Sequence, residues 1–148
     1  MAGVRVGAGG SGQGGISAQV PALPTAVDLL EEYRRAGRYL ADGDPVSAAR
    51  LLEPICAAEP GNAEVRLQLA LACFASAQLG RAEAHLRTLV DRDPSDHYAH
   101  HVLGRTLERL NRPSEALTHL RLAYAMSPVP DYREALDRVS ARVSRPGR

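Results

Sequence analysis

Beyond the N-terminal region, the order of apolar and polar residues predicts short helices separated by turns. Residues 63–76 form a helical window without Pro or Gly, and Asn62 stands before it as a favourable N-cap. Gln78-Leu79-Gly80 is interpreted as a break, and residues 82–91 form a second helical window that ends before Pro94. This stretch therefore predicts two helices joined by a turn.

The neighbouring stretches show the same pattern. Behind Asp96, a helical window covers residues 97–110. Pro113 suits the first position of the next helix, where its missing N–H costs nothing. Asp44 and Pro45 are expected to take the cap and first-turn roles in the preceding stretch. Each stretch thus predicts a helical hairpin.

The three stretches repeat one another at an interval of 34 residues. Small residues, leucines and prolines recur in four columns: Ala36, Ala70 and Gly104; Ala48, Ala82 and Ala116; Leu52, Leu86 and Leu120; Pro60, Pro94 and Pro128. A small residue where two helices cross lets their backbones approach closely, and the leucines are expected to pack between neighbouring units. The period predicts three helix-turn-helix repeats, at about residues 27–60, 61–94 and 95–128.

One further helix is predicted at about residues 131–143. Asp131-x-x-Glu134 resembles a capping box at its start. Its apolar residues step by four, three and four, which places them on one stripe: Tyr132, Leu136, Val139 and Val143. A solenoid needs a terminal element with a polar outer face, so we interpret this helix as the cap of a domain over residues 25–144. Residues 145–148 form a short basic tail.

The N-terminal residues 1–24 are rich in Gly, Ser, Gln and Pro and are expected to be disordered. Within them, Gly7 to Gly12 matches the G-x-G-x-x-G pattern of a dinucleotide-binding turn. Such a turn needs a helix directly behind it and a second strand beyond, whereas Gln13-Gly14-Gly15 and a Pro-bounded linker follow here. We therefore expect no nicotinamide nucleotide to bind, and no cofactor.

The repeats carry a recognisable pattern. The third has His100-x2-Leu103-Gly104-x2-Leu107, then Ala116-x3-Leu120, then Pro128; the second has Arg66-x2-Leu69-Ala70-x2-Cys73, then Ala82-x3-Leu86, then Pro94. They resemble tetratricopeptide repeats, whose pattern is W-x2-L-G-x2-Y, then A-x3-F, then P. The first repeat is weaker, because Arg35 replaces the usual Leu. The resemblance implies an all-α superhelical solenoid of three repeats and one capping helix.

The resemblance also implies a function, since proteins of this family bind extended or helical peptides along the concave face formed by the first helix of each repeat. The expected groove contains Tyr33, Leu40, Leu67, Leu71, Phe74, Tyr98, His101, Arg105 and Glu108, with Leu30 and Gly37 on the same stripe. The family's chaperone-tail clamp is not expected, because its places hold Tyr33, Gly37, Gln68, Tyr98 and Val102. A protein or peptide partner is therefore expected, and a self-associating structural unit or homodimer is the alternative.

Charge and composition narrow the classes of partner and cellular location that are expected. The net charge is +1, with 17 acidic residues against 18 basic ones that are all arginine, so nucleic acid is not an expected partner. The absence of lysine is interpreted as the coding bias of a GC-rich bacterium. No apolar run is long enough for a membrane span. Cys56 and Cys73 are interpreted as buried reduced thiols, which suits a cytoplasmic protein.

One histidine cluster could carry chemistry. His97 and His101 share a helix face with His100 beside them, and a carboxylate such as Asp93 or Asp96 could complete a metal site. Packing is the favoured interpretation, because His100 takes the buried Trp column of the repeat. We therefore expect no metal ligands and no catalytic residues, and interpret the chain as non-enzymatic.

Overall fold

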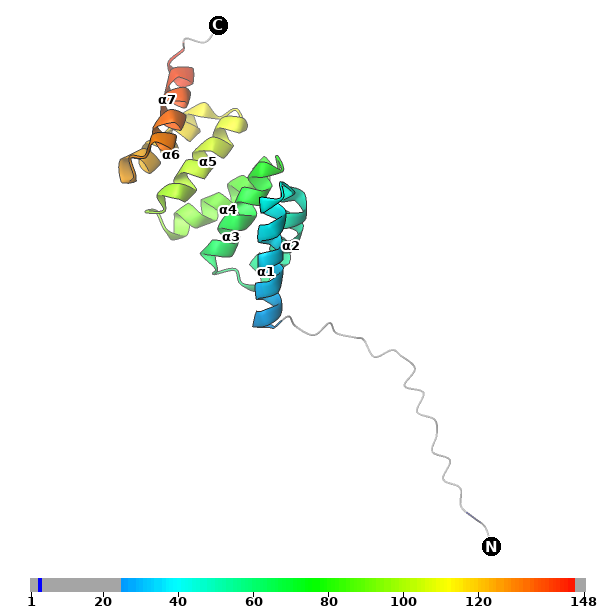
Figure 1. Ribbon diagram of the computed structural model, residues 1–148. Helices are drawn as coiled ribbons and strands as arrows, with labels where there is room; N and C mark the ends of the chain where they lie inside the picture. Colours follow the sequence, from blue (N-terminus) through cyan, green and yellow to red (C-terminus); the bar gives the residue numbers. More distant parts are fainter. Residues whose placement is uncertain (1–2, 4–24, 146–148) are drawn as a thin grey trace.

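The computed structural model describes Gly3 and residues 25–145, and in these residues it contains helices and no strands. The helices are α1 (Ala26–Ala41), α2 (Pro45–Ala58), α3 (Ala63–Ala75), α4 (Leu79–Arg92), α5 (His97–Arg109), α6 (Pro113–Met126) and α7 (Pro130–Ser144), shown in Figure 1. The predicted disordered tail, with its glycine motif, lies outside the described residues apart from Gly3, and so does the basic tail after Arg145. No described helix combines the length and hydropathy needed to cross a bilayer.

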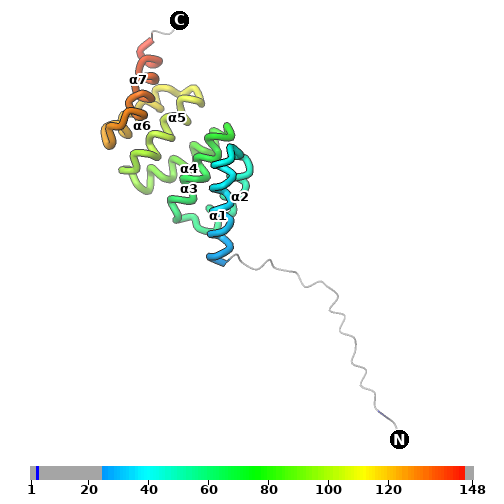
Figure 2. The backbone as a smooth tube through the Cα atoms, viewed as in Figure 1, coloured from blue at the N-terminus to red at the C-terminus, as the bar shows by residue number. Residues whose placement is uncertain are grey.

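The helices pack in the order of the chain. Within pairs, α1 contacts α2, α3 contacts α4 and α5 contacts α6; between pairs, α2 contacts α3, α4 contacts α5 and α6 contacts α7. Figure 2 shows the resulting stack, with α1 and α7 at opposite ends. The all-α solenoid of three helix pairs and one additional helix is therefore confirmed.

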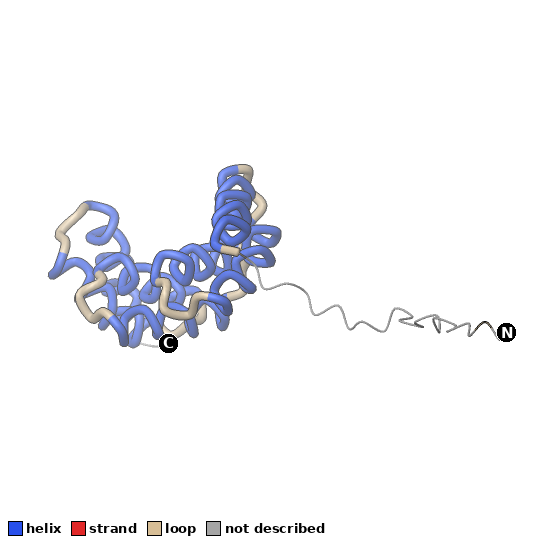
Figure 3. The backbone as a smooth tube through the Cα atoms, turned by 90° about the horizontal axis from the view of Figure 1, so that it is seen from below, coloured by secondary structure: helices blue, strands red, loops and turns tan. Residues whose placement is uncertain are grey.

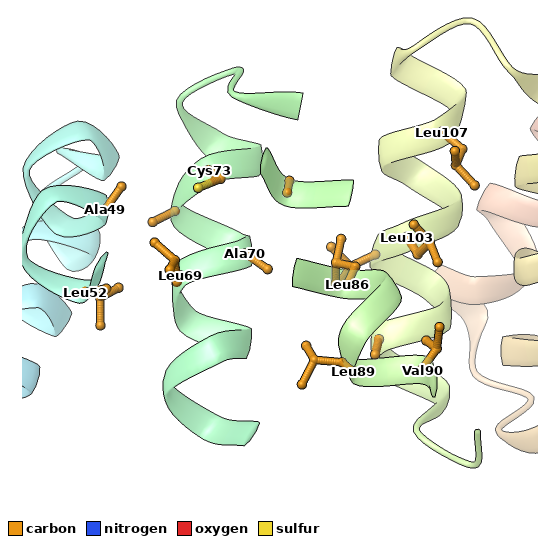
Figure 4. Close-up of a cluster of buried hydrophobic side chains, with 14 of the residues drawn as sticks. Ala49, Leu52, Leu69, Ala70, Cys73, Leu86, Leu89, Val90, Leu103 and Leu107 are labelled. Carbon is orange, nitrogen blue, oxygen red and sulfur yellow. The ribbon is translucent and has the colours of Figure 1, made fainter. Parts of the chain in front are cut away.

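The repeated small and leucine columns form the core. Ala48, Ala82 and Ala116 are fully buried, as are the leucines of the second helices, Leu52, Leu86 and Leu120. In Figure 4, Leu69 of α3 points towards α2 and Ala70 points towards Leu86 of α4. The first helices α3 and α5 are each packed between two second helices, which is why the helix pairs stack into one continuous core.

Each pair is joined by a turn with one residue in the left-handed region. Gly43, Ala77 and Asn111 have φ of 77°, 60° and 61°, and they stand 34 residues apart. The predicted break at Gln78-Leu79-Gly80 is therefore misplaced: α4 begins at Leu79, and Gly80 lies in its first turn. The reversal falls on Ala77, because repeat geometry imposes a left-handed conformation there that alanine itself does not favour.

Side-chain caps begin several helices as predicted. Asp44, Asn62 and Asp96 accept hydrogen bonds from the backbone N–H three residues ahead, and Thr25 forms a capping box with Asp28. The capping box predicted for α7 is wrong. Pro130 occupies the first helical position instead, Val129 is the N-cap, and no side-chain capping bond is made.

The solenoid is curved, as Figure 3 shows from below. First helices of successive pairs contact one another, α3 with α5 and α5 with α7, so they lie on the inner side of the curve. The second helices are connected by ion pairs between side chains: Arg81 with Glu53, Arg112 with Glu83 at 2.8 Å, and Arg87 with Glu115 at 3.5 Å. The concave face is therefore built from α1, α3, α5 and α7.

Candidate functional site: a groove on the concave face

The residues expected in the groove lie on the three first helices: Tyr33 and Leu40 on α1, Leu67, Leu71 and Phe74 on α3, and Tyr98, His101, Arg105 and Glu108 on α5. Those on α1 and α3 are half-buried and pack against the core with one side while keeping the other accessible. Tyr98 and Arg105 are exposed, Glu108 is half-buried and His101 is buried. The groove thus changes character along its length, from apolar on α1 and α3 to polar on α5.

Tyr33 organises the apolar half. Its hydroxyl donates to Glu64 Oε1 at 3.2 Å, and Gln68 Nε2 donates to the same oxygen at 3.4 Å. Burial, together with the negative charge of Glu64, raises the pKa of Tyr33, so the hydroxyl stays a donor at neutral pH. Beside it, Gly37 and Leu40 line a hollow of about 160 Å³ between α1 and α3.

Phe74 marks the boundary between the two halves. The guanidinium carbons of Arg105 and Arg109 lie 5.2 Å and 4.8 Å from the centre of its ring, and Arg109 Nη1 also donates to the backbone carbonyl of Phe74 at 3.0 Å. The negative face of an aromatic ring attracts a cation, so the ring fixes both positive charges at one place. Arg109 is a groove residue that the predicted stripe omits, although its proximity to Arg105 is visible in the sequence.

Glu108 forms its ion pair with Arg138 of α7 and not with Arg105 or Arg109. Its two carboxylate oxygens accept from Nε and Nη2 of Arg138 at 2.8 Å and 2.9 Å. The hydrogen bonds from Arg138 lower the pKa of Glu108, and burial opposes that shift only in part. Within the described residues, Arg105 and Arg109 have no ion-pair partner. Two cations therefore face the groove without an ion pair.

His101 lies beneath α7 rather than on the open groove surface. Its ring stacks on that of Tyr132, with 4.3 Å between the centres, and only 6% of the residue is exposed. Burial, aided by the charge of Arg105, lowers the pKa of His101 to about 4, so the side chain is neutral at pH 7. The helical stripe predicts His101 in the groove, but the stripe alone does not show that the capping helix covers this residue.

The other histidines of the cluster have packing partners. His100 is buried between α5 and α6, where its Nδ1 lies 3.0 Å from Nδ1 of His119 and its Nε2 lies 3.0 Å from the carbonyl of Pro94. Nδ1 of His97 lies 2.9 Å from the hydroxyl of Tyr132. The described residues hold no group of three or more His, Cys, Asp or Glu side chains arranged to bind a metal ion.

The second repeat supports this packing role. Arg66 stands one period before His100, and it binds the corresponding partners: Nη1 lies 3.1 Å from Nδ1 of His85, and Nη2 donates to the carbonyl of Pro60 at 3.1 Å. The same pair of contacts made by two different side chains indicates that His100 connects the two helices of its repeat.

The groove also includes residues of α7 that the predicted stripe omits. Asp131, Glu134 and Arg138 line a hollow of about 210 Å³ opposite Arg105. The sequence pattern predicts a capping role for Asp131 and Glu134 and a position off the apolar stripe for Arg138. The signal that could have identified them is the repeat itself, since α7 continues the series of first helices and turns the same face to the concave side.

Comparison with known proteins places the chain in a family. A family model described as Tetratricopeptide repeat matches residues 39–106. Comparison with curated protein sequences gives no match.

Solved structures share the fold. The first TPR of Spaghetti (RPAP3) bound to an HSP90 peptide has a TM-score of 0.75 at 18% identity, over 82% of this chain and 97% of that one. The second TPR domain of human RPAP3, in complex with an HSP70 peptide, has a TM-score of 0.70 at 18% identity, over 76% and 94%. The Sgt2 TPR domain from Aspergillus fumigatus has a TM-score of 0.73 at 16% identity, over 84% and 88%.

Proposed function

This chain is a tetratricopeptide repeat protein, and on that premise we propose that it is a non-enzymatic interaction module that binds a peptide or helix of a partner protein in its concave groove. Two of the solved structures that share its fold carry a bound peptide, which supports a binding role for the groove. The proposal places the protein in a reducing cytoplasm, because Cys56 and Cys73 are both buried free thiols.

The observation that carries the proposal is the cluster of Phe74, Arg105 and Arg109 beside the half-exposed leucines of α3. Two guanidinium groups without a carboxylate partner stand next to apolar side chains that water still reaches. A monomer gains little from such an arrangement, since the charges stay unpaired and the leucines only partly buried. A ligand that brings a carboxylate and apolar side chains satisfies both.

The ligand that fits is a short amphipathic segment, apolar along most of its length and with a carboxylate near one end. Arg105 would hold the carboxylate through a charge-assisted hydrogen bond. The apolar contacts with Leu67, Leu71 and Phe74 would supply most of the affinity. A single small groove offers few anchors, so we expect micromolar binding, roughly −8 kcal/mol.

The test is affinity capture of partners on the intact protein, followed by titration of the recovered partner against variants. Phe74→Ala removes the ring and Arg105→Glu reverses the charge, and both should weaken binding several-fold. Matched controls lie on α6, where Leu122 and Arg121 are exposed away from the concave face, so Leu122→Ala and Arg121→Glu should leave binding unchanged. Wild-type binding by both groove variants would disprove the groove as the binding face.

Self-association is the second candidate, and exposed apolar side chains near the end of α6 favour it: Leu122, Met126 and Val129 are each 39–44% exposed. Sedimentation of the intact protein separates the two functions. An adaptor without its partner sediments as a monomer near 15.8 kDa, whereas a structural unit sediments as a dimer or larger species.

A further inference from the structure

An apolar pocket of about 380 Å³ opens where the concave face begins, between α1, the end of α2 and the start of α3. Its walls include Leu29 and Leu30 of α1, Ile55 of α2 and Val65 of α3. Ile55 and Val65 are buried, whereas Leu30 is 47% exposed at the mouth. Tyr33 forms one edge and separates this pocket from the smaller hollow beside Gly37. The pocket therefore adjoins the apolar half of the groove, with Tyr33 as the residue common to both.

The corresponding space two repeats later is filled by an aromatic ring. His97 and His101 stand two periods after Leu29 and Tyr33, and Tyr132 is the third residue of α7 just as Val65 is the third residue of α3. The ring of Tyr132 stacks on His101, and its hydroxyl lies 2.9 Å from Nδ1 of His97. Val65 has only two methyl groups at this place. The first repeat therefore leaves open a space that the third repeat closes with a tyrosine.

Two carboxylates without cationic partners stand at the mouth of the pocket. Glu64 accepts the hydroxyl of Tyr33, and Glu59 accepts from Asn62 Nδ2 at 3.1 Å, but neither forms an ion pair with any described residue. A positive charge placed beside an occupant of the pocket would be attracted to both carboxylates. This end of the groove is thus acidic, whereas the end at Arg105 and Arg109 is basic.

We propose that this pocket receives an aromatic side chain of the partner segment, followed or preceded by a lysine or arginine that pairs with Glu64. The inference rests on the proposed function and specifies its ligand. An aromatic residue with a basic neighbour binds over α1 and α3, and a carboxylate further along the same segment binds over α5. The two ends of the groove then fix the direction in which the partner lies.

The test titrates the capped dipeptide N-acetyl-Trp-Arg-amide into the full chain. Binding is monitored by NMR of the methyl groups of the protein. We expect millimolar binding, with shifts at the methyl groups of Leu29, Leu30, Ile55 and Val65, whereas N-acetyl-Ala-Arg-amide should cause none. Glu64→Gln should weaken the Trp-Arg dipeptide several-fold and leave N-acetyl-Trp-Ala-amide unchanged, because only the first carries the cation.

A substitution that fills the pocket tests the proposal more directly than the loss of one charge. Val65→Phe places a ring where Tyr132 lies in the third repeat, and it should weaken dipeptide binding by at least about tenfold. Val46→Phe is the matched control, since Val46 is 51% exposed on α2 outside the pocket, and it should bind like wild type. Should Val65→Phe fail to fold, Leu30→Gln at the exposed mouth serves in its place, since it removes apolar wall without adding charge and should weaken binding several-fold.

Absence of dipeptide binding, or binding like that of wild type by Val65→Phe and Leu30→Gln, would overturn the inference. Methyl shifts that depend on protein concentration without dipeptide would identify a second copy as the occupant and would equally overturn it. A captured partner that is sensitive to Phe74→Ala and Arg105→Glu but not to Val65→Phe would leave the groove function standing and refute the role of this pocket. A dipeptide that binds in the pocket, with no partner in the groove, would support the pocket and count against the groove function.

Discussion

A Cβ atom on Gly104 would lie 2.5 Å from Cδ2 of Leu120, which is far inside the normal contact distance. It would also lie 3.2 Å from the carbonyl oxygen of Ala116, so the backbones of α5 and α6 approach closely at this point. The other two pairs have Ala36 and Ala70 in the same column, and both are fully buried. Only the third pair is packed so tightly that a single methyl group does not fit.

Gly104→Ala is therefore expected to destabilise the fold. Overpacking against the fully buried Leu120 costs about 1–3 kcal/mol, which exceeds the gain of up to ~1 kcal/mol in helix propensity. Gly37→Ala is the matched control, because Gly37 lies inside α1 with no atom within 4 Å of an added Cβ. It should stabilise by roughly 0.5–1 kcal/mol. Urea unfolding of both variants measures the difference, and a gain in stability for Gly104→Ala would show that the contact is looser than described.

The capping helix is expected to contribute through specific buried side chains. Val139 is fully buried against the third repeat, whereas Val143 is 38% exposed at the end of the predicted apolar stripe. Val139→Ala should cost about 2 kcal/mol, and Val143→Ala should change stability by less than ~0.5 kcal/mol. Removing α7 entirely should expose the covered face and cause aggregation, measured by light scattering. A truncated protein that stayed monomeric with an unchanged melting temperature would refute the cap assignment.

Acid should destabilise the protein partly through His101. Its pKa of about 4 lies below the ordinary 6.5, so between these values the unfolded chain binds a proton that the folded chain does not. Stability is therefore complete above about pH 6.5 and falls as the pH drops towards 4, with a loss of about 2.5 kcal/mol at about pH 4.5. His101→Phe keeps a ring against Tyr132 without a titrating group. The urea midpoint of His101→Phe should fall less than that of wild type between neutral and acid pH. An equal fall in the two midpoints would contradict the lowered pKa of His101.

The ion pairs should differ in strength with burial. The Glu83 side chain is 17% exposed and receives both Arg87 and Arg112 at 2.8 Å, whereas Asp137 is 64% exposed beside Arg133. Glu83→Gln should cost about 1 kcal/mol because it removes the less exposed of the two negative charges that Arg87 and Arg112 share. Asp137→Asn should cost less than ~0.5 kcal/mol. Equal losses in urea unfolding would mean that the two pairs are equally screened by solvent.

The repeats are predictable from sequence because their determinants are local and periodic. A fixed interval of small residues and leucines dictates which faces meet, and Asn62 and Asp96 mark helix starts within three residues of their partners. The turn at Ala77 escapes prediction, because alanine carries no signal for a left-handed conformation and only comparison with the equivalent Gly43 and Asn111 reveals it.

The site is less predictable, since its chemistry depends on contacts between distant residues. No local signal shows that Arg138, 30 positions away, neutralises Glu108, or that Tyr132 covers His101. The stripe on the first helices predicts which residues face the groove. It does not identify which of them remain available to a ligand, because that depends on how α7 docks.

The three left-handed turn residues also affect how a protein of this kind can gain or lose repeats in evolution. Gly43, Ala77 and Asn111 reverse the chain at the same place in each repeat, so every joint presents the next helix with the same geometry. A duplicated or deleted block of one period would meet its neighbours through joints of the same shape. The length of the concave face can thus be set by duplication of gene segments, in whole steps, while the two ends keep their own specialised contacts.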